Sequence, residues 1–182
     1  MKRLIALALV LLPVGAEAAA RRPLVAEATV LAEWGKAENR RACAPLAFAT
    51  DGAGGGRARR AQFGGGWGVA FDRPGLRSAY GLAGTGLLPE DSASFAEQRD
   101  SLARQWPYGR ELPGLRAGAF AGYGLEGAKP LAAGDGDGRG QNLLAYVRVP
   151  GQRCLYNVWS RLGRRHLELL LDGLRPVPAV RR

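Results

Sequence analysis

The stretch Asn142–His166, NLLAYVRVPGQRCLYNVWSRLGRRH, decides the fold that we expect for this chain. Its first eight residues, NLLAYVRV, and residues 153–160, RCLYNVWS, are two runs rich in apolar and aromatic residues, which is typical of β-strands. Between the two runs, Pro150 followed by Gly151 suits the two middle positions of a type II turn. The stretch therefore predicts two antiparallel strands joined as a hairpin.

The register of this hairpin depends on the length of its loop. A two-residue loop pairs Val147 with Cys154 and makes one face of the hairpin wholly apolar. The further pairs would be Ala145 with Tyr156 and Leu143 with Val158. The same register places Arg148 opposite Arg153, a mildly unfavourable pair of like charges, and two-residue hairpins favour primed turns. A register shifted by a bulge is therefore the alternative.

A helix is predicted after the hairpin, over residues 161–173, with Ser160 as its N-cap and Pro176 beyond its end. Its leucines occupy one side of the helical wheel and its charged residues the other, so we expect an amphipathic helix packed on the sheet. The apolar side consists of Leu162, Leu167, Leu169, Leu170, Leu171 and Leu174. His166 falls on this side, so we expect a backbone carbonyl or a tyrosine hydroxyl to bind it in the core. It is also the candidate functional histidine.

The rest of the chain mixes helix and strand patterns. Helices are predicted over residues 24–40 and 92–105, the second with a capping box formed by Ser94 and Glu97. The segment GWGVAFD, the turn RPG and the alternating residues after it predict a second hairpin, and a glycine-rich strand covers residues 118–125. We therefore expect an α+β domain. It would have an antiparallel sheet of about five strands, an N-terminal helix, a middle helix and a C-terminal amphipathic helix.

The N-terminus has the three-part layout of a secretory signal peptide. A positive start, MKR, is followed by an eleven-residue apolar run and by the small residues AEA. This run is shorter than the roughly 20 residues of a membrane-spanning helix, so no retained transmembrane anchor is expected. We predict that residues 1–18 are cleaved off after Ala18, with Ala20 as the alternative. Residues 19–182 would then be a single domain in the periplasm or outside the cell.

Cys43 and Cys154 are the two cysteines of the chain. In an oxidising compartment such an even pair is most simply a disulfide. Because the two positions are 111 residues apart, the chain-entropy model gives an upper figure of about 4–5 kcal/mol of stabilisation, which strain and denatured-state effects reduce. Two buried free thiols, or a reactive cysteine, are the alternatives.

The chain is basic, with a formal net charge of +10 that falls to +9 when Lys2, Arg3 and Glu17 leave with the leader. Such a surface attracts anionic partners, although the abundance of Arg, Ala and Gly also fits a GC-rich genome. The candidate partner-binding residues are Arg57, Arg59, Arg60, Arg161, Arg164 and Arg165, with further clusters at Arg40–Arg41 and Arg181–Arg182. Export disfavours nucleic acid as the partner and favours an anionic envelope component or an acidic protein.

Motifs for catalysis or cofactor binding are weak. A Cys154–His166 dyad would need a thiolate, which a disulfide removes. The segment DGDGRG at residues 135–140 has the acids and the glycine of a calcium loop, but Arg139 and Tyr146 stand where oxygen ligands are needed. The glycine-rich segments lack the Lys-Ser/Thr of a P-loop and the spacing of a dinucleotide fingerprint, and one histidine excludes a multi-histidine zinc site. We therefore predict no catalytic residue, no metal and no cofactor.

Several segments resemble a group of small uncharacterised secreted proteins of GC-rich alphaproteobacteria. These segments are EWGKAENRRACAPLAF, GGWGVAFDRPGLRSAYGLAGTG, QWPY, GYGLEG and YNVWSRLGRRHLELLLDGLRPV. The resemblance covers nearly the whole mature chain and implies export, with no activity to transfer. The late hairpin, the amphipathic helix and the closing LRPV are also similar, more loosely, to PsbP/Mog1-like sandwiches. That likeness is architectural and implies nothing about a site.

These patterns favour an exported accessory or binding domain that is not an enzyme. A small periplasmic hydrolase-like enzyme and a structural partner in an envelope complex are the alternatives. A concave pocket in which His166 meets a carboxylate and an accessible tyrosine would favour an enzyme. A filled core with arginines aligned on one face would favour binding.

Overall fold

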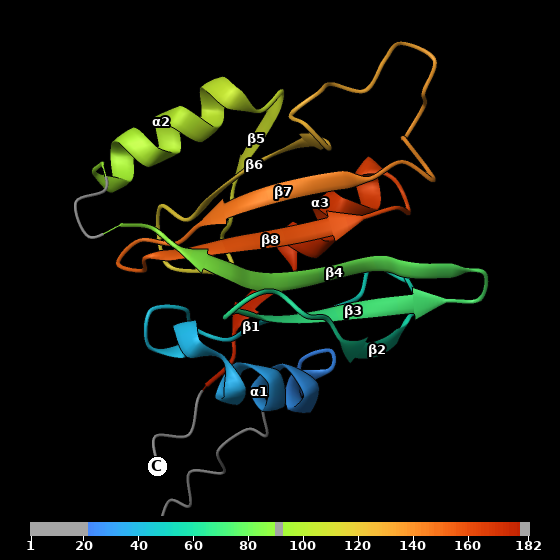
Figure 1. The fold of residues 1–182 in the computed structure, drawn as a ribbon. Coiled ribbons are helices and arrows are strands. Elements are labelled where there is room, and N and C mark those ends of the chain that lie inside the picture. The colour runs from blue at the N-terminus through green and yellow to red at the C-terminus, as the bar shows by residue number, and fades with distance from the viewer. Residues whose placement is uncertain (1–21, 90–92, 179–182) are drawn as a thin grey trace, which may run out of the picture.

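A seven-stranded antiparallel sheet forms the framework of the protein, in the order β2-β3-β4-β8-β7-β6-β5 (Figure 1). The computed structural model describes residues 22–89 and 93–178. The predicted leader and the Arg181–Arg182 cluster lie outside the described residues. The strands of this sheet are β2 (Arg57–Arg60), β3 (Trp67–Arg73), β4 (Leu76–Leu87), β5 (Tyr108–Glu111), β6 (Phe120–Leu125), β7 (Leu143–Arg148) and β8 (Cys154–Ser160).

Two further strands, β1 (Leu46–Phe48) and β9 (Leu174–Pro176), pair with each other as a separate antiparallel sheet. The helical elements are α1 (Glu27–Lys36), the short 3₁₀ helix η1 (Glu38–Arg41), α2 (Phe95–Gln105) and α3 (Arg164–Asp172). The predicted α+β class and the three helices are confirmed. The expectation of about five strands was too low, because the strands it missed are three or four residues long and, in β2 (RARR) and β5 (YGRE), carry no apolar alternation.

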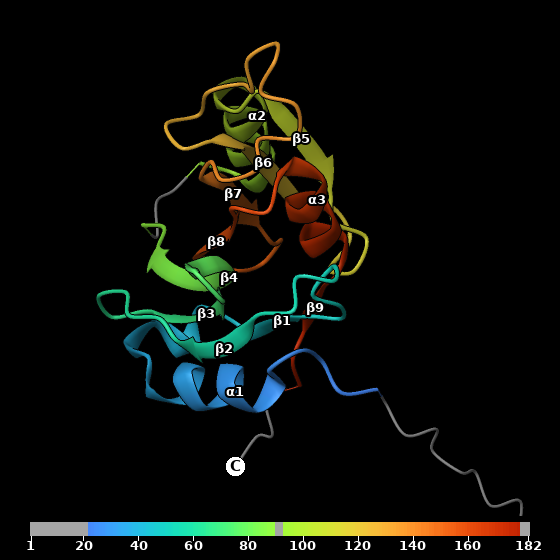
Figure 2. The ribbon, with the colours of Figure 1, turned by 90° about the vertical axis from the view of Figure 1, so that its right-hand side faces the viewer.

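The core lies on one face of the sheet. Along β8, Cys154, Tyr156, Val158 and Ser160 are buried and alternate with half-buried residues. This face packs against α1, α3 and the β1–β9 pair, whereas α2 packs on the opposite face, over β5, β6 and β7. Figures 1 and 2 show this division, with α3 behind β7 and β8 in the first view and to their right in the second.

The hairpin of β7 and β8 is present, but its register differs by two residues from that of a two-residue loop. Val147 pairs with Tyr156, and the ladder continues through Ala145 with Val158 and Leu143 with Ser160. A shift of two keeps the same side chains on the apolar face. The Pro-Gly pair does form a type II turn, with Gly151 at φ 77° and the Gln152 amide bonded to the Val149 carbonyl. The longer loop removes the repulsive Arg148–Arg153 pair from the ladder.

Each of the three helices begins later than the sequence predicted, and α1 and α3 also end earlier. α1 ends at Lys36, because the extended Ala37 redirects the chain and the amides of Glu38 and Asn39 bond to the Gly65 carbonyl. α2 begins at Phe95, where the predicted Ser94–Glu97 capping box is present. α3 begins after Gly163 instead of at Ser160.

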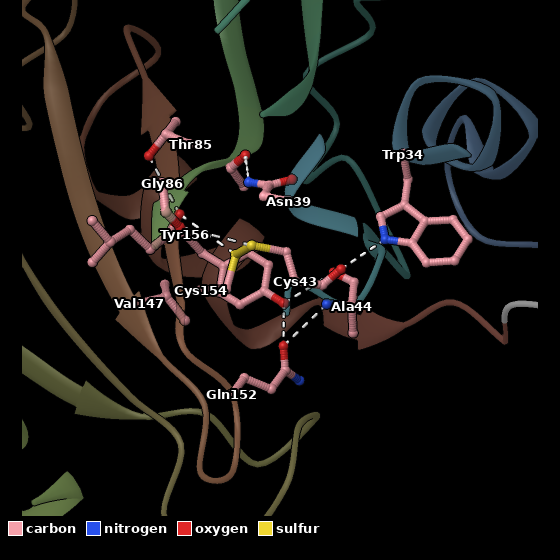
Figure 3. Close-up of a disulfide and its surroundings, with 12 residues drawn as sticks. Trp34, Asn39, Cys43, Ala44, Thr85, Gly86, Val147, Gln152, Cys154 and Tyr156 are labelled. Carbon is pink, nitrogen blue, oxygen red and sulfur yellow. Dashed lines mark hydrogen bonds between the residues drawn. A yellow bond between two sulfur atoms is a disulfide. The ribbon is translucent and has the colours of Figure 1, made fainter. Parts of the chain in front are cut away.

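The predicted Cys43–Cys154 disulfide is confirmed, and both cysteines are buried. It joins the end of η1 to the first residue of β8 (Figure 3). Around it, the Trp34 indole donates to the Cys43 carbonyl over 2.7 Å and the Tyr156 hydroxyl donates to the Ala44 carbonyl over 2.9 Å. The Asn39 amide reaches the Gly84 carbonyl over 3.0 Å. These contacts fix the N-terminal layer on β4 and β8.

Removing the disulfide should therefore destabilise the whole domain. For the double variant Cys43→Ala/Cys154→Ala we expect the free energy of unfolding to fall by about 2–4 kcal/mol, because the unfolded chain regains the entropy of a 111-residue loop. Urea denaturation of the variant and of the oxidised protein measures this difference. An unchanged midpoint would contradict the role given to the bond.

Candidate functional site

Three segments that are distant in sequence meet at one end of the sheet, on the right in Figure 1. They are the β3–β4 hairpin, the corner between the end of β8 and the start of α3, and the loop of residues 126–142. Arg161 links them, because its amide donates to the Ala79 carbonyl and its own carbonyl accepts from Gly140, each over 2.8 Å. The Arg164 amide adds a bond of 2.7 Å to the Asp137 carbonyl.

A pocket of about 290 Å³ opens at this end. Arginines from all three segments line it, namely Arg73, Arg139 and Arg165. The other lining residues are Gly52, Ala53, Asp137, Leu162, His166 and Leu169. Within residues 22–89 and 93–178, none of the three arginines forms an ion pair. We name this the arginine pocket.

Asp137 is the acidic residue of the arginine pocket, and its carboxylate already accepts a hydrogen bond from a backbone amide. One of its carboxylate oxygens accepts from the Arg165 amide over 2.9 Å, at the start of α3. Gly163, the N-cap residue, has no side chain for this purpose, so Asp137 caps the helix from the neighbouring loop. The capped amides are not free for a ligand, and the positive charge of the pocket therefore comes from the guanidinium groups.

His166 forms the inner wall of the arginine pocket and is 8% exposed. Its Nε2 atom lies 2.9 Å from the Asp51 carbonyl oxygen, and its Nδ1 atom lies 2.9 Å from the Ser160 hydroxyl. Because a carbonyl only accepts, Nε2 carries the proton and Nδ1 accepts from Ser160. The Ser160 oxygen in turn accepts from the Leu162 amide over 3.0 Å. The imidazole is therefore neutral, with both nitrogens bonded.

The carboxylate and the tyrosine nearest to His166 are engaged as well. The Tyr80 ring packs edge-on against the imidazole, with 5.0 Å between the ring centroids, and its hydroxyl donates to the Asp51 carboxylate over 3.2 Å. Tyr80 is fully buried, and burial raises its pKa to about 12. Ser160 is fully buried too. The cluster thus contains serine, histidine, aspartate and tyrosine, but no accessible nucleophile or proton donor.

The six arginines named from the sequence do not form one surface. Three are held in ion pairs: Arg59 with Asp72, Arg60 with Glu33 and Arg164 with Glu168. Arg164 also stacks on the Tyr108 ring at 3.8 Å.

The remaining three lie in different places. Arg57 is on the edge strand β2, Arg161 lines a second pocket and Arg165 lines the arginine pocket. Arg73 was not among the site residues predicted from the sequence. Arg139 was considered only as a residue that does not fit the calcium-loop pattern. The segment DGDGRG instead supplies Asp137, which caps the start of α3. No group of three His, Cys, Asp or Glu side chains in the described part of the chain is placed to hold a metal ion.

Comparisons with known proteins give no relative: no family model, no curated protein and no solved structure matches the chain. No described helix is long and apolar enough to cross a membrane. The function is therefore inferred from the chemistry of the pockets.

Because His166 is buried as a neutral imidazole, the stability of the protein should depend on pH. Burial, with a further contribution from the positive charge of Arg73, holds the pKa of His166 below its ordinary value of about 6.5, although the Asp51 carbonyl and the charges of Asp51 and Asp137 oppose the shift. The unfolded chain therefore takes up a proton first as the pH falls, and the stability that the neutral imidazole contributes is lost from pH 6.5 downward.

A single histidine makes this prediction direct to test. In an NMR titration the imidazole protons should report a pKa below 6.5, and urea midpoints should fall between pH 7 and pH 5. The variant His166→Gln should show a smaller fall over the same range. A titration at or above 6.5 would contradict the burial of a neutral imidazole at this position.

Proposed function

We propose that this protein is an exported binding module without catalytic activity, which holds a phosphate-bearing group of an envelope component in the arginine pocket. Support for export comes from the leader pattern and the disulfide, a bond typical of oxidising compartments. The observation that carries the binding role is the convergence of Arg73, Arg139 and Arg165 on one pocket without ion pairs.

Three guanidinium groups in one pocket repel each other, and a bound anion relieves that repulsion. Arginine presents a planar fork of N–H donors that matches phosphate oxygens, and such charge-assisted bonds are stronger than neutral ones. The volume of about 290 Å³ lies just below the roughly 300–1,000 Å³ range of small-molecule sites. It suits a terminal phosphate or a lipid headgroup better than a large ligand.

The hydrolase alternative has less support. An enzyme of this kind needs a nucleophile that substrate can reach and a histidine nitrogen that is free to move a proton. Ser160 is fully buried, and both nitrogens of His166 are bonded to the protein. This arrangement favours a structural role for the histidine and a binding role for the arginines beside it.

Isothermal titration calorimetry with inorganic phosphate and with glycerol phosphate tests the proposal. Arg139→Gln/Arg165→Gln should weaken binding by at least tenfold, since a hydrogen bond to a charged group contributes about 1.5–3 kcal/mol. The matched control is Arg41→Gln/Arg104→Gln, which removes the same charge from exposed positions outside the pocket and should bind as the parent does. Asp137→Asn should bind more tightly, because it keeps a capping oxygen but loses the negative charge.

Sedimentation with vesicles separates the two sources of the phosphate. Phosphatidylglycerol vesicles should pull down the parent protein at low salt and should release the Arg139→Gln/Arg165→Gln variant, if the ligand is a lipid headgroup. Binding of soluble phosphate without vesicle binding would assign the pocket to a soluble or glycan-linked phosphate. Equal losses in the pocket variant and in the control would contradict the proposal, since only total charge would then matter.

A further inference from the structure

On the face of the sheet opposite the core, β3 and β4 carry very small residues. They include Gly68, Ala70, Gly81 and Ala83, and the contacts of α1 and α3 with this part of the sheet come from the other face. Two aromatic rings cover these small residues. A Cβ atom added to Gly81 would collide with the Trp159 ring, and one added to Gly68 would collide with the Phe63 ring. The two rings are 6.1 Å apart.

A second pocket, of about 270 Å³, lies beside Trp159. Its apolar wall combines Trp159 with Leu143 and Leu144, the latter being the residue paired with Trp159 across β7 and β8. Its polar wall consists of Arg77, Ser78, Glu126, Asn142 and Arg161. We name it the tryptophan pocket. An indole beside several planar polar groups is a composition that suits a ring with one apolar face and polar substituents.

The polar wall of the tryptophan pocket contains hydrogen-bond donors and acceptors without a partner in the described part of the chain. The Asn142 amide donates to the Glu126 carboxylate over 3.1 Å, which leaves acceptor sites on both groups and one further N–H donor on Asn142. Arg161 forms no ion pair with any described residue, and its Nε atom is buried without a hydrogen-bond partner. A buried guanidinium N–H without a partner is costly. A ligand with a negative group in the pocket would compensate this cost by pairing with the rest of the guanidinium group.

The rim of the tryptophan pocket holds a strained residue. Ser78 has φ 51°, a conformation that costs free energy for a residue with a side chain. An ion pair holds it there: Asp72 accepts from the Ser78 amide over 2.6 Å, while Arg59 binds the Asp72 carboxylate over 2.7 Å and the Ser78 hydroxyl. Strain of this kind, kept by a dedicated network, is concentrated at functional sites.

We propose that the tryptophan pocket binds one residue of an acidic sugar, such as a uronic acid. The C–H face of the sugar ring lies against Trp159, its carboxylate pairs with Arg161 and Arg77, and its hydroxyls bond to Asn142 and Glu126. The two arginines outweigh the one carboxylate among the lining residues, so a negative ring is favoured over a neutral one. This site is separate from the arginine pocket and does not depend on phosphate binding there.

Calorimetry with trimeric galacturonate, and with the trimer of neutral galactose as the comparison, tests this proposal. The parent protein should bind the acidic trimer at least tenfold more tightly than the neutral one. Trp159→Leu should weaken binding of the acidic trimer by at least tenfold, whereas the control Phe63→Leu, which removes the neighbouring ring from outside the pocket, should change it by less than about twofold. Arg161→Gln should abolish the preference for the acidic trimer.

Further measurements keep the result interpretable. If Trp159→Leu lowers the melting temperature too far, the indole N–H resonance of Trp159 in the parent protein should still shift when the acidic trimer is added. The Arg139→Gln/Arg165→Gln variant should bind the trimer normally, and inorganic phosphate should not displace it. No binding of the acidic trimer, no preference over the neutral one, or an equal loss in Phe63→Leu would overturn the proposal.

Discussion

The pairing of β4 with β8 is the interaction on which the rest of the structure depends. In the sheet order it is the one junction between the segment β2–β4 and the segment β5–β8. The ladder runs from Tyr80 and Ser160 at one end to Leu87 and Cys154 at the other. The disulfide fixes the second end to the N-terminal layer, and the bond from the Arg161 amide to the Ala79 carbonyl extends the first end. Both pockets lie at that first end.

This junction explains why arginines without ion pairs gather at one end of the sheet. It brings the β3–β4 hairpin, with Arg73 and Arg77, beside the corner between β8 and α3, with Arg161 and Arg165. Ion pairs neutralise other arginines of the chain, including those of β2 that bind Asp72 and Glu33. The arginines of the two pockets have no such partner among the described residues. The buried, neutral His166 forms the inner wall of the arginine pocket without adding to its charge.

The sequence predicted those features that depend on local pattern. Two runs rich in apolar residues located the β7–β8 hairpin, and pairing them across the turn at Pro150 and Gly151 gave its buried face. The spacing of Ser94 and Glu97 located the capping box of α2. The disulfide followed from the export signal and the cysteine count. The expectation that a backbone carbonyl binds His166 is confirmed, because a histidine among leucines must satisfy its nitrogens inside the core.

Features that depend on tertiary contacts were not predictable in this way. The cap of α3 comes from Asp137, in a loop that is distant in sequence, so Ser160 was the natural but wrong choice. The arginine pocket combines Arg73, Arg139 and Arg165, which are each isolated from the others in sequence. Clustering along the chain selected Arg165 and Arg161, which line the two pockets, but also Arg59 and Arg60, whose charges the fold neutralises. The sequence therefore indicated the sign of the surface charge and part of the unpaired charge, but not which residues combine into a pocket.

The most direct measurement of the central claim is a two-dimensional NMR titration of the parent protein with inorganic phosphate, following every backbone amide. A saturable shift confined to the arginine pocket is predicted, at Gly52, Ala53, Arg139, Arg165 and His166, with little change at the exposed Arg41 and Arg104. Small, non-saturating shifts spread over all exposed arginines would contradict it. That pattern would mean that the positive charge of this protein is a general property of its surface instead of a site.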